Sequence, residues 1–116
     1  MLAFQYRFHG HGSLRYVYKN GTAHRSRTMT VKVTRNERRK VSRFSVVISK
    51  KVHKSAVGRN RMRRRMYEII RHDLPHITRA YDVAVIITSS EVITMDYSAL
   101  RVQIKSLFKE AGLYDR

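Results

Sequence analysis

Six arginines lie between positions 59 and 71, in a stretch whose apolar residues recur at the spacing of a helix. Each guanidinium is a planar fork that can donate two parallel charge-assisted hydrogen bonds to one phosphate group. Like charges repel when they are gathered on one element, so folding gains nothing from this arrangement. The residue types and their spacing therefore predict contact with a polyanion, and a folded RNA backbone matches such a helix.

The positive charge begins before this helix, in the segment SKKVHK at 49–54. Between positions 50 and 65 the chain has eight Lys and Arg and no acid, while Asn60 adds uncharged donors and an acceptor. Two other interpretations stay open: a solvated basic face, and a helix that lies on a membrane surface. Met62 and Met66 are better explained as core than as a membrane-facing edge, so nucleic acid is the preferred partner.

The composition agrees with a nucleic-acid partner and excludes several protein classes. The net charge is +17, whereas roughly 2–8 units suffice for the solubility of a small domain. Nineteen of the Lys and Arg precede position 68, against one acid, whereas from Glu68 onward there are six Lys and Arg and seven acids. The absence of cysteine excludes disulfides and thiolate zinc sites and fits the cytoplasm. We expect a single domain over 1–116, without a membrane span or signal peptide.

Groups that could catalyse a reaction are scarce. His9 and His11 lie in a glycine-bracketed segment, HGHG, which favours a flexible loop over a weak metal site. The other histidines considered have no obvious carboxylate partner in the sequence; they are His53, His72 and His76. No nucleophile triad, phosphate-binding loop or paired carboxylates suited to two metal ions can be recognised. We therefore expect no catalytic residues and no metal site on this chain.

The apolar pattern predicts the elements that hold these residues. A short helix at 13–19 could begin at Ser13 and end in a left-handed Gly21. Alternation of polar and apolar residues indicates strands at 28–34 and 43–50, which we expect to pair as an antiparallel hairpin around the charged turn NERRK.

The C-terminal half predicts a different set of elements. Pro75 ends the basic helix, whose apolar stripe is Met62, Met66, Ile69 and Ile70. The apolar run YDVAVIIT at 81–88 is typical of a central strand. A last helix begins near Thr94 or Asp96 and stops at Gly112.

These elements predict an α+β sandwich, a small sheet with its helices packed on one face. A further short strand could form at 22–26. The other sheet face would be open, either as plain solvated sheet or as a cradle for a single RNA strand. The hairpin residues on that face would be Thr28, Thr30, Lys32, Thr34, Ser45, Val47 and Ser49.

The segment SKKVHKSAVGRNRMRR at 49–64 closely resembles the signature of the protein subunit of bacterial ribonuclease P. Its Ser-Lys-Lys strand end, Ala-Val step and Arg-Asn-Arg helix start match that family, with Arg63 where lysine is common. The resemblance extends to LRYVYKNG at 14–21, YDVAVIIT, and MDYSALRVQIKSLF near the C-terminus. It implies a two-layer α/β sandwich in the order αβββαβα, with a small mixed sheet. It also implies a left-handed β-α-β crossover around the basic helix, where the general rule predicts a right-handed one.

The resemblance implies a function as well. The chain would be the accessory subunit of a ribonucleoprotein endonuclease that removes the 5′ leader from precursor tRNA, with Mg²⁺ held mainly by the catalytic RNA subunit. Free of RNA, it is expected to be a monomer. The residues implied to bind the RNA subunit are Lys50, Lys51, Lys54, Arg59, Asn60, Arg61, Arg63 and Arg64. The residues assigned to a leader-binding cleft are Leu14, Tyr18, Arg27, Thr30 and Lys32.

Two positions depart from the family pattern. Leu14 replaces a phenylalanine that is usual in the cleft, whereas Tyr18 keeps an aromatic ring at the second cleft position. Tyr67 replaces an arginine that is frequent in the basic helix, and Arg65 is the nearest substitute for that charge. The alternative function is that of a ribosomal-type protein that binds folded rRNA, which explains the size and charge but not the specific run at 49–64.

Overall fold

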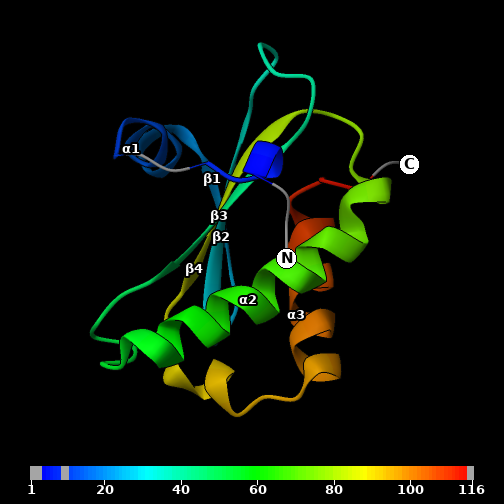
Figure 1. Ribbon diagram of the computed structural model, residues 1–116. Coiled ribbons are helices and arrows are strands. Elements are labelled where there is room, and N and C mark those ends of the chain that lie inside the picture. Colours follow the sequence, from blue (N-terminus) through cyan, green and yellow to red (C-terminus); the bar gives the residue numbers. More distant parts are fainter. Residues whose placement is uncertain (1–3, 9–10, 115–116) are drawn as a thin grey trace.

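The computed structural model describes residues 4–8 and 11–114, and the order of its elements confirms the predicted αβββαβα arrangement of an α+β fold (Figure 1). The α-helices of these residues are α1 (His11–Asn20), α2 (Ala56–Asp73) and α3 (Tyr97–Glu110). The strands are β1 (Thr22–Arg25), β2 (Met29–Arg35), β3 (Arg43–Ile48) and β4 (Tyr81–Ile87). Short 3-10 turns are η1 (Phe4–Tyr6), η2 (Leu74–His76) and η3 (Ser90–Ile93).

The strands form a mixed sheet in the order β1-β2-β4-β3. β2 is antiparallel to β1 and β4, whereas β3 runs parallel to β4. The predicted hairpin of β2 with β3 is therefore wrong, because β4 lies between them. Alternation identifies a strand but not its partner, and β4, which is buried along nearly its whole length, takes the central place.

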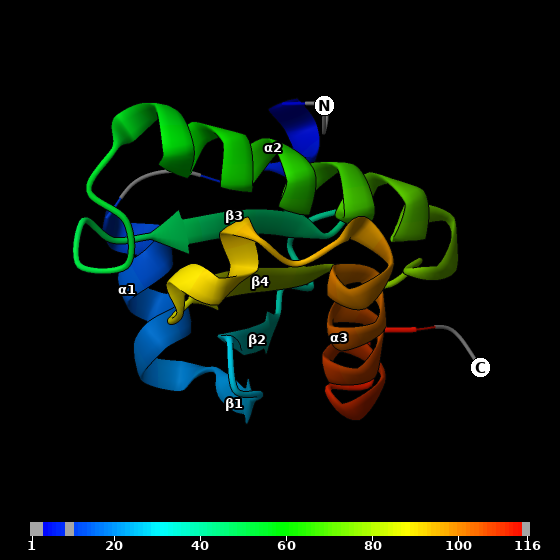
Figure 2. The same cartoon turned by 90° about the horizontal axis from the view of Figure 1, so that it is seen from below.

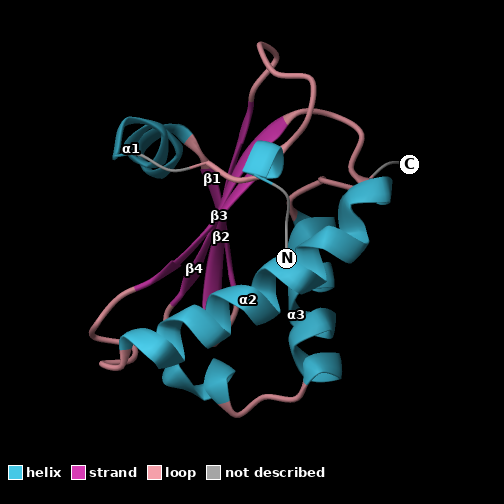
Figure 3. Ribbon diagram, viewed as in Figure 1, coloured by secondary structure: helices cyan, strands magenta, loops and turns pink. Residues whose placement is uncertain are grey.

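The charged segment predicted as a hairpin turn is instead a loop that passes the start of β4. Asn36 N donates to Ala80 O at 3.0 Å. Ser42 Oγ donates to Arg79 O at 2.6 Å and accepts from Tyr81 N at 2.9 Å. This loop and the loop at 49–55, which flank β3, lie at opposite ends of the sheet (Figure 3).

Two layers of side chains pack on the sheet. The larger apolar cluster joins α2 and α3 to one face of the sheet, through buried residues such as Val31, Val85 and Phe108. Helix α1 lies on the opposite face of the sheet (Figure 2). There the smaller cluster packs Val17 and Phe8 with Ala84. The expectation that all helices cover one face is therefore wrong for α1.

The face under α1 is less open than expected. Ser45 is only 6% exposed, and Thr28 is fully buried, with its hydroxyl donating to Gln103 of α3. Thr28 precedes β2 and belongs to the α3 side of the sheet rather than to the open face.

The ends of the two long helices follow the sequence signals. Ser55 begins α2 by accepting a hydrogen bond from Gly58 N at 3.2 Å. Asp96, not Thr94, begins α3 by accepting from Ala99 N at 2.8 Å, and Gly112 follows the helix with a φ of 76°. Both α2 and α3 are thus fixed in register at their first turn.

The ends of α1 differ from the prediction. Ser13 lies within the helix, which begins at His11. Gly21 is not left-handed; a Cβ there would lie 2.5 Å from the carbonyl oxygen of Val17. Glycine is therefore required by a close approach of the backbone to itself, not by a positive φ.

Candidate nucleic-acid interface

The predicted basic helix has the two faces that its spacing indicates. Met62, Met66, Ile69 and Ile70 are at most 1% exposed and pack against the sheet. The opposite side and the preceding loop form a basic face, which we define by its exposed residues: Lys50, Lys51, Lys54, Asn60, Arg61 and Arg64. Arg59 and Arg63 are half-buried at its border. The structure thus brings all eight residues of the predicted RNA-subunit site onto α2 and its entry loop.

Arg59 holds the entry loop in place. Its Nη1 donates to His53 O at 2.9 Å and to Lys54 O at 3.0 Å. A Cβ on Gly58 would meet the imidazole ring of His53, so a larger residue there would have to displace that side chain. Lys50, Lys51 and Lys54 are therefore carried by a loop whose shape depends on the first arginine of the helix.

Asn60 and Arg63 are joined on the helix surface. Arg63 Nη1 donates to Asn60 Oδ1 at 2.6 Å, which leaves the NH2 group of this exposed residue as a donor. Arg61 and Arg64 make no ion pair with another residue of 4–8 or 11–114. These two guanidinium groups are the ones most available to phosphates.

Arg65 and Arg71 are engaged within the protein. Arg65 donates to the carbonyl oxygens of Val92 and Ile93, both at 3.3 Å, and so ties η3 to α2. Arg65 does not replace the charge missing at Tyr67, because its guanidinium lies on the side of η3. Tyr67 itself is buried, and its hydroxyl accepts from Val46 N at 3.1 Å on the outer edge of β3.

Arg71 forms an ion pair with Glu68, one turn earlier on α2. The hydrogen bond from Arg71 lowers the pKa of Glu68 to about 2. His72 Nε2 also lies 3.5 Å from the same carboxylate, so the expectation that His72 has no carboxylate partner is wrong. The i, i+3 and i, i+4 spacing to Glu68 was the signal for both contacts.

A second polar surface lies on the other side of the sheet. Lys32 Nζ donates to Tyr18 O at 2.9 Å and lies 5.5 Å from the centre of the Tyr18 ring. Burial raises the pKa of Tyr18, although 38% of the side chain remains exposed. Leu14 borders the small apolar cluster under α1, and Thr30 projects from the same face of β2 as Lys32. We call this set, Leu14, Tyr18, Thr30 and Lys32, the α1–sheet face.

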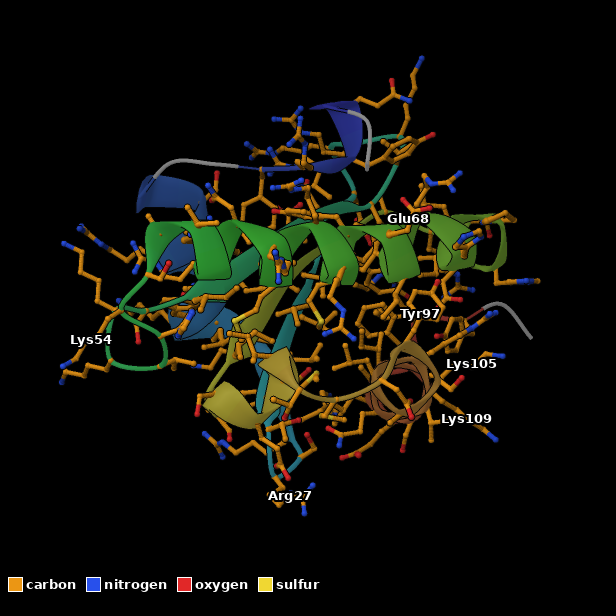
Figure 4. All side chains as sticks on the ribbon, turned by 60° about the horizontal axis from the view of Figure 1, so that its bottom comes forward. Arg27, Lys54, Glu68, Tyr97, Lys105 and Lys109 are labelled. Carbon is orange, nitrogen blue, oxygen red and sulfur yellow. The ribbon has the colours of Figure 1, made fainter. Side chains whose placement is uncertain are left out.

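Arg27, the remaining residue predicted for the leader cleft, is separate from this face. It lies in the turn between β1 and β2, where its guanidinium pairs with Glu91 of η3 at 3.1 Å. Figure 4 shows Arg27 at the end of the molecule, away from Lys54. The structure therefore gathers four of the five predicted cleft residues.

A groove next to the α1–sheet face was not foreseen. It has a volume of about 740 Å³ and lies between α1 and the loop after β2. Arg43 in its wall is neutralised, because it donates to both carboxylate oxygens of Asp82, at 3.0 and 2.8 Å. Arg38 and Arg39 are exposed at its rim, and Tyr16 of α1 is 59% exposed. The charged run NERRK, which the sequence predicts as a hairpin turn, supplies part of the lining of this groove.

Within 4–8 and 11–114, no three or more His, Asp or Glu side chains are grouped so that they could hold a metal ion. No helix of that part of the chain is long and apolar enough to cross a membrane. His9 of the HGHG segment lies outside the described residues, whereas Gly12 belongs to α1.

Comparison with known proteins gives one consistent family. The family model described as Ribonuclease P matches residues 2–112. The ribonuclease P protein component of Clostridium kluyveri is 35% identical over 111 residues, which are 94% of this chain and 96% of that protein. The one from a Synechocystis species is 34% identical over 99 residues, 85% and 79% of the two chains. The solved RNase P protein of Staphylococcus aureus has the same fold, with a TM-score of 0.85 at 24% identity over 95% of this chain and 98% of that one.

Proposed function

The chain belongs to the ribonuclease P protein family, and from this premise we propose that it is the protein subunit of a ribonuclease P ribonucleoprotein. Its activity would be that of the whole particle, an endonuclease that hydrolyses precursor tRNA at the mature 5′ end. The observation that carries the proposal is the basic face on α2 and its entry loop, at the run 49–64 that resembles the family signature.

The basic face would bind the catalytic RNA subunit. Arg61 and Arg64 present exposed forks to phosphates, and the lysines of the entry loop extend the same surface. Arg59 contributes by holding that loop, so part of its effect would be structural. Asn60 offers a neutral donor that phosphates or base edges can accept.

The α1–sheet face would hold the 5′ leader of precursor tRNA. Tyr18 offers a partly exposed ring for a base to stack on, and Lys32 places a positive charge beside that ring. Leu14 would contribute only an apolar contact. Because Arg27 is paired with Glu91 away from this face, we assign the leader contact to the other four residues.

The physical role of the protein is to lower the repulsion between two RNAs. The catalytic RNA and its substrate are both polyanions, and a chain of net charge +17 between them releases counterions from both. Its effect should therefore be largest when divalent ions are scarce. Following the family resemblance, we propose that the Mg²⁺ needed for hydrolysis is held mainly by the RNA subunit and that this chain supplies no catalytic residue. The protein would act in the cytoplasm and be a monomer before it binds RNA.

The test is cleavage of precursor tRNA by the cognate RNA subunit at low Mg²⁺, with and without the protein. Strong stimulation with a cut at the mature 5′ end is expected. Tight RNA binding without stimulation would instead favour the ribosomal-type alternative, a protein that binds folded rRNA. The family match over residues 2–112 is the reason to prefer the first outcome.

A further inference from the structure

Helix α3 has a row of cations that belongs to neither surface described above. Arg101, Lys105 and Lys109 recur every four residues and are all exposed. Steps of four residues turn by only about 40° around a helix, so the three side chains lie along one side of α3. Tyr97, one step earlier, is 38% exposed at the start of the same row. We call these four residues the α3 row.

The α3 row is distant from the lysines of the entry loop. Figure 4 shows Lys54 at one end of α2, and Tyr97, Lys105 and Lys109 near the other end of that helix. By an axial rise of about 1.5 Å per residue, the row from Arg101 to Lys109 is about 12 Å long. That length spans more than one phosphate of an RNA strand.

The charges of the α3 row are not neutralised within the described part of the chain. From Glu68 to Glu110 every acid is engaged elsewhere: Glu68 with Arg71, Asp73 with Tyr114, Asp82 with Arg43, Glu91 with Arg27, Asp96 as the first-turn cap of α3, and Glu110 with His24. No ion pair joins Arg101, Lys105 or Lys109 to another residue of 4–8 or 11–114. The near-neutral composition of the C-terminal third therefore conceals a cationic surface that no acid among the described residues pairs with.

The row is also held in a fixed orientation. The opposite side of α3 is anchored in the core by Leu100, Ile104, Leu107 and Phe108, which are at most 3% exposed. Beyond the helix, Tyr114 donates to Asp73 Oδ2 of α2 at 2.7 Å, which ties the end of α3 to α2. Because α3 cannot rotate against the core, its three cations stay on the solvent side of the helix. The backbone that carries them is therefore preorganised for a ligand.

We infer that the α3 row is a second RNA-binding surface, which contacts the phosphodiester backbone of the same RNA that the basic face binds. Lys and Arg in a row are suited to phosphates, and the exposed ring of Tyr97 can stack on an unpaired base. An acidic protein would also meet the charge, but an RNA already bound at α2 is present at a high effective concentration. This inference rests on the proposed function for the identity of that RNA.

The test uses the assembled particle and a charge-matched control. The triple variant Arg101→Gln, Lys105→Gln, Lys109→Gln removes the cations of the row, whereas Arg15→Gln, Lys19→Gln, Arg79→Gln removes three exposed cations outside every surface proposed here. The row variant should bind the RNA subunit about tenfold more weakly and reduce the slope of log K against log salt by about 2–3. Equal binding by the two triple variants, each shown by circular dichroism to be folded, would overturn the inference.

A direct contact readout separates this inference from the proposed function. Val102, 67% exposed beside the row, is replaced by the photo-crosslinking residue p-benzoylphenylalanine in the full chain. We expect irradiation of the complex to crosslink position 102 to the RNA subunit and the row variant to lose that crosslink. A crosslink to protein alone, or none in a complex that cleaves precursor tRNA normally, would reject the RNA surface. Absence of cleavage stimulation by the wild-type protein would instead reject the proposed function, because the crosslink does not depend on cleavage.

Discussion

Nη1 of Arg59 lies 2.9 Å from the carbonyl oxygen of His53, so the first arginine of α2 binds the loop that leads into its own helix. The same nitrogen also reaches Lys54 O at 3.0 Å. One guanidinium nitrogen donates to both carbonyls here, while the remaining N–H groups of the planar fork stay available for a ligand. The charge of Arg59 and the shape of its fork therefore contribute separately to the interface.

Arg59→Lys separates these two contributions. The substitution keeps the charge but loses the fork, so the loop at 49–55 should lose order and binding to the RNA subunit should weaken about three- to tenfold, since each lost hydrogen bond is worth roughly 0.5–1.5 kcal/mol. Binding is measured by titration, and loop order by amide hydrogen exchange. Arg71→Lys is the matched control, because Arg71 is paired with Glu68 and does not contact the entry loop, and it should stay within about twofold. If the two lysine variants behaved alike, the structural role of Arg59 would be disproved.

Periodicity was sufficient to predict α2 and α3, and Asp96 was one of two predicted starts of α3, because apolar stripes and caps act within a few residues of sequence. The pairing of β2 with β3 could not be predicted in the same way, since β4 enters the sheet from much later in the chain. The handedness of the crossover through α2 stays a prediction.

The candidate sites also differ in whether nearby or distant residues determine them. The basic face was predictable because it lies on one continuous stretch of chain. The partners of Arg27, Arg43 and Arg65 come from distant elements, so the contacts that engage these arginines within the protein were visible only in the structure. For the same reason, the sequence did not indicate the α3 row. Acids close to it in sequence suggest a balanced charge, but in the structure they contact other residues.

Arg61→Ala and Arg64→Ala each remove one exposed, unpaired cation from the basic face. Each should weaken binding to the RNA subunit and reduce the slope of log K against log salt by about 0.7–0.9, because one fewer phosphate contact releases one fewer counterion. The slope is measured between low and physiological salt. Arg71→Ala is the control, since Arg71 is paired with Glu68. A slope unchanged from wild type in both single variants would count against phosphate contacts by α2.

Tyr18→Ala tests the α1–sheet face. Loss of the ring should weaken binding of precursor tRNA with a leader by about 1–3 kcal/mol, the contribution of one base stacked on an aromatic ring. The affinity for mature tRNA should stay unchanged. The affinities of the holoenzyme for the two tRNAs are compared. Tyr18→Phe keeps the ring and should behave like wild type, because the hydroxyl is not needed for stacking. An equal loss of affinity for both tRNAs would reject a leader contact at this position.

Tyr114 and Asp73 predict how stability changes in alkali. Burial, together with the hydrogen bond to Asp73, raises the pKa of Tyr114 above its ordinary value of 10.0. A folded-state pKa above the unfolded one means that this contact stabilises the protein fully below about pH 10 and is progressively lost as the pH rises further. Tyr114→Phe should lower the free energy of unfolding at pH 8 by about 1 kcal/mol, the usual contribution of one hydrogen bond. The wild-type protein should also lose stability more steeply than this variant above pH 10, as measured by urea titration at several pH values. Parallel pH profiles for the two proteins would show that the Tyr114 hydroxyl titrates as it does in the unfolded chain, and that α3 is tied to α2 by its apolar contacts alone.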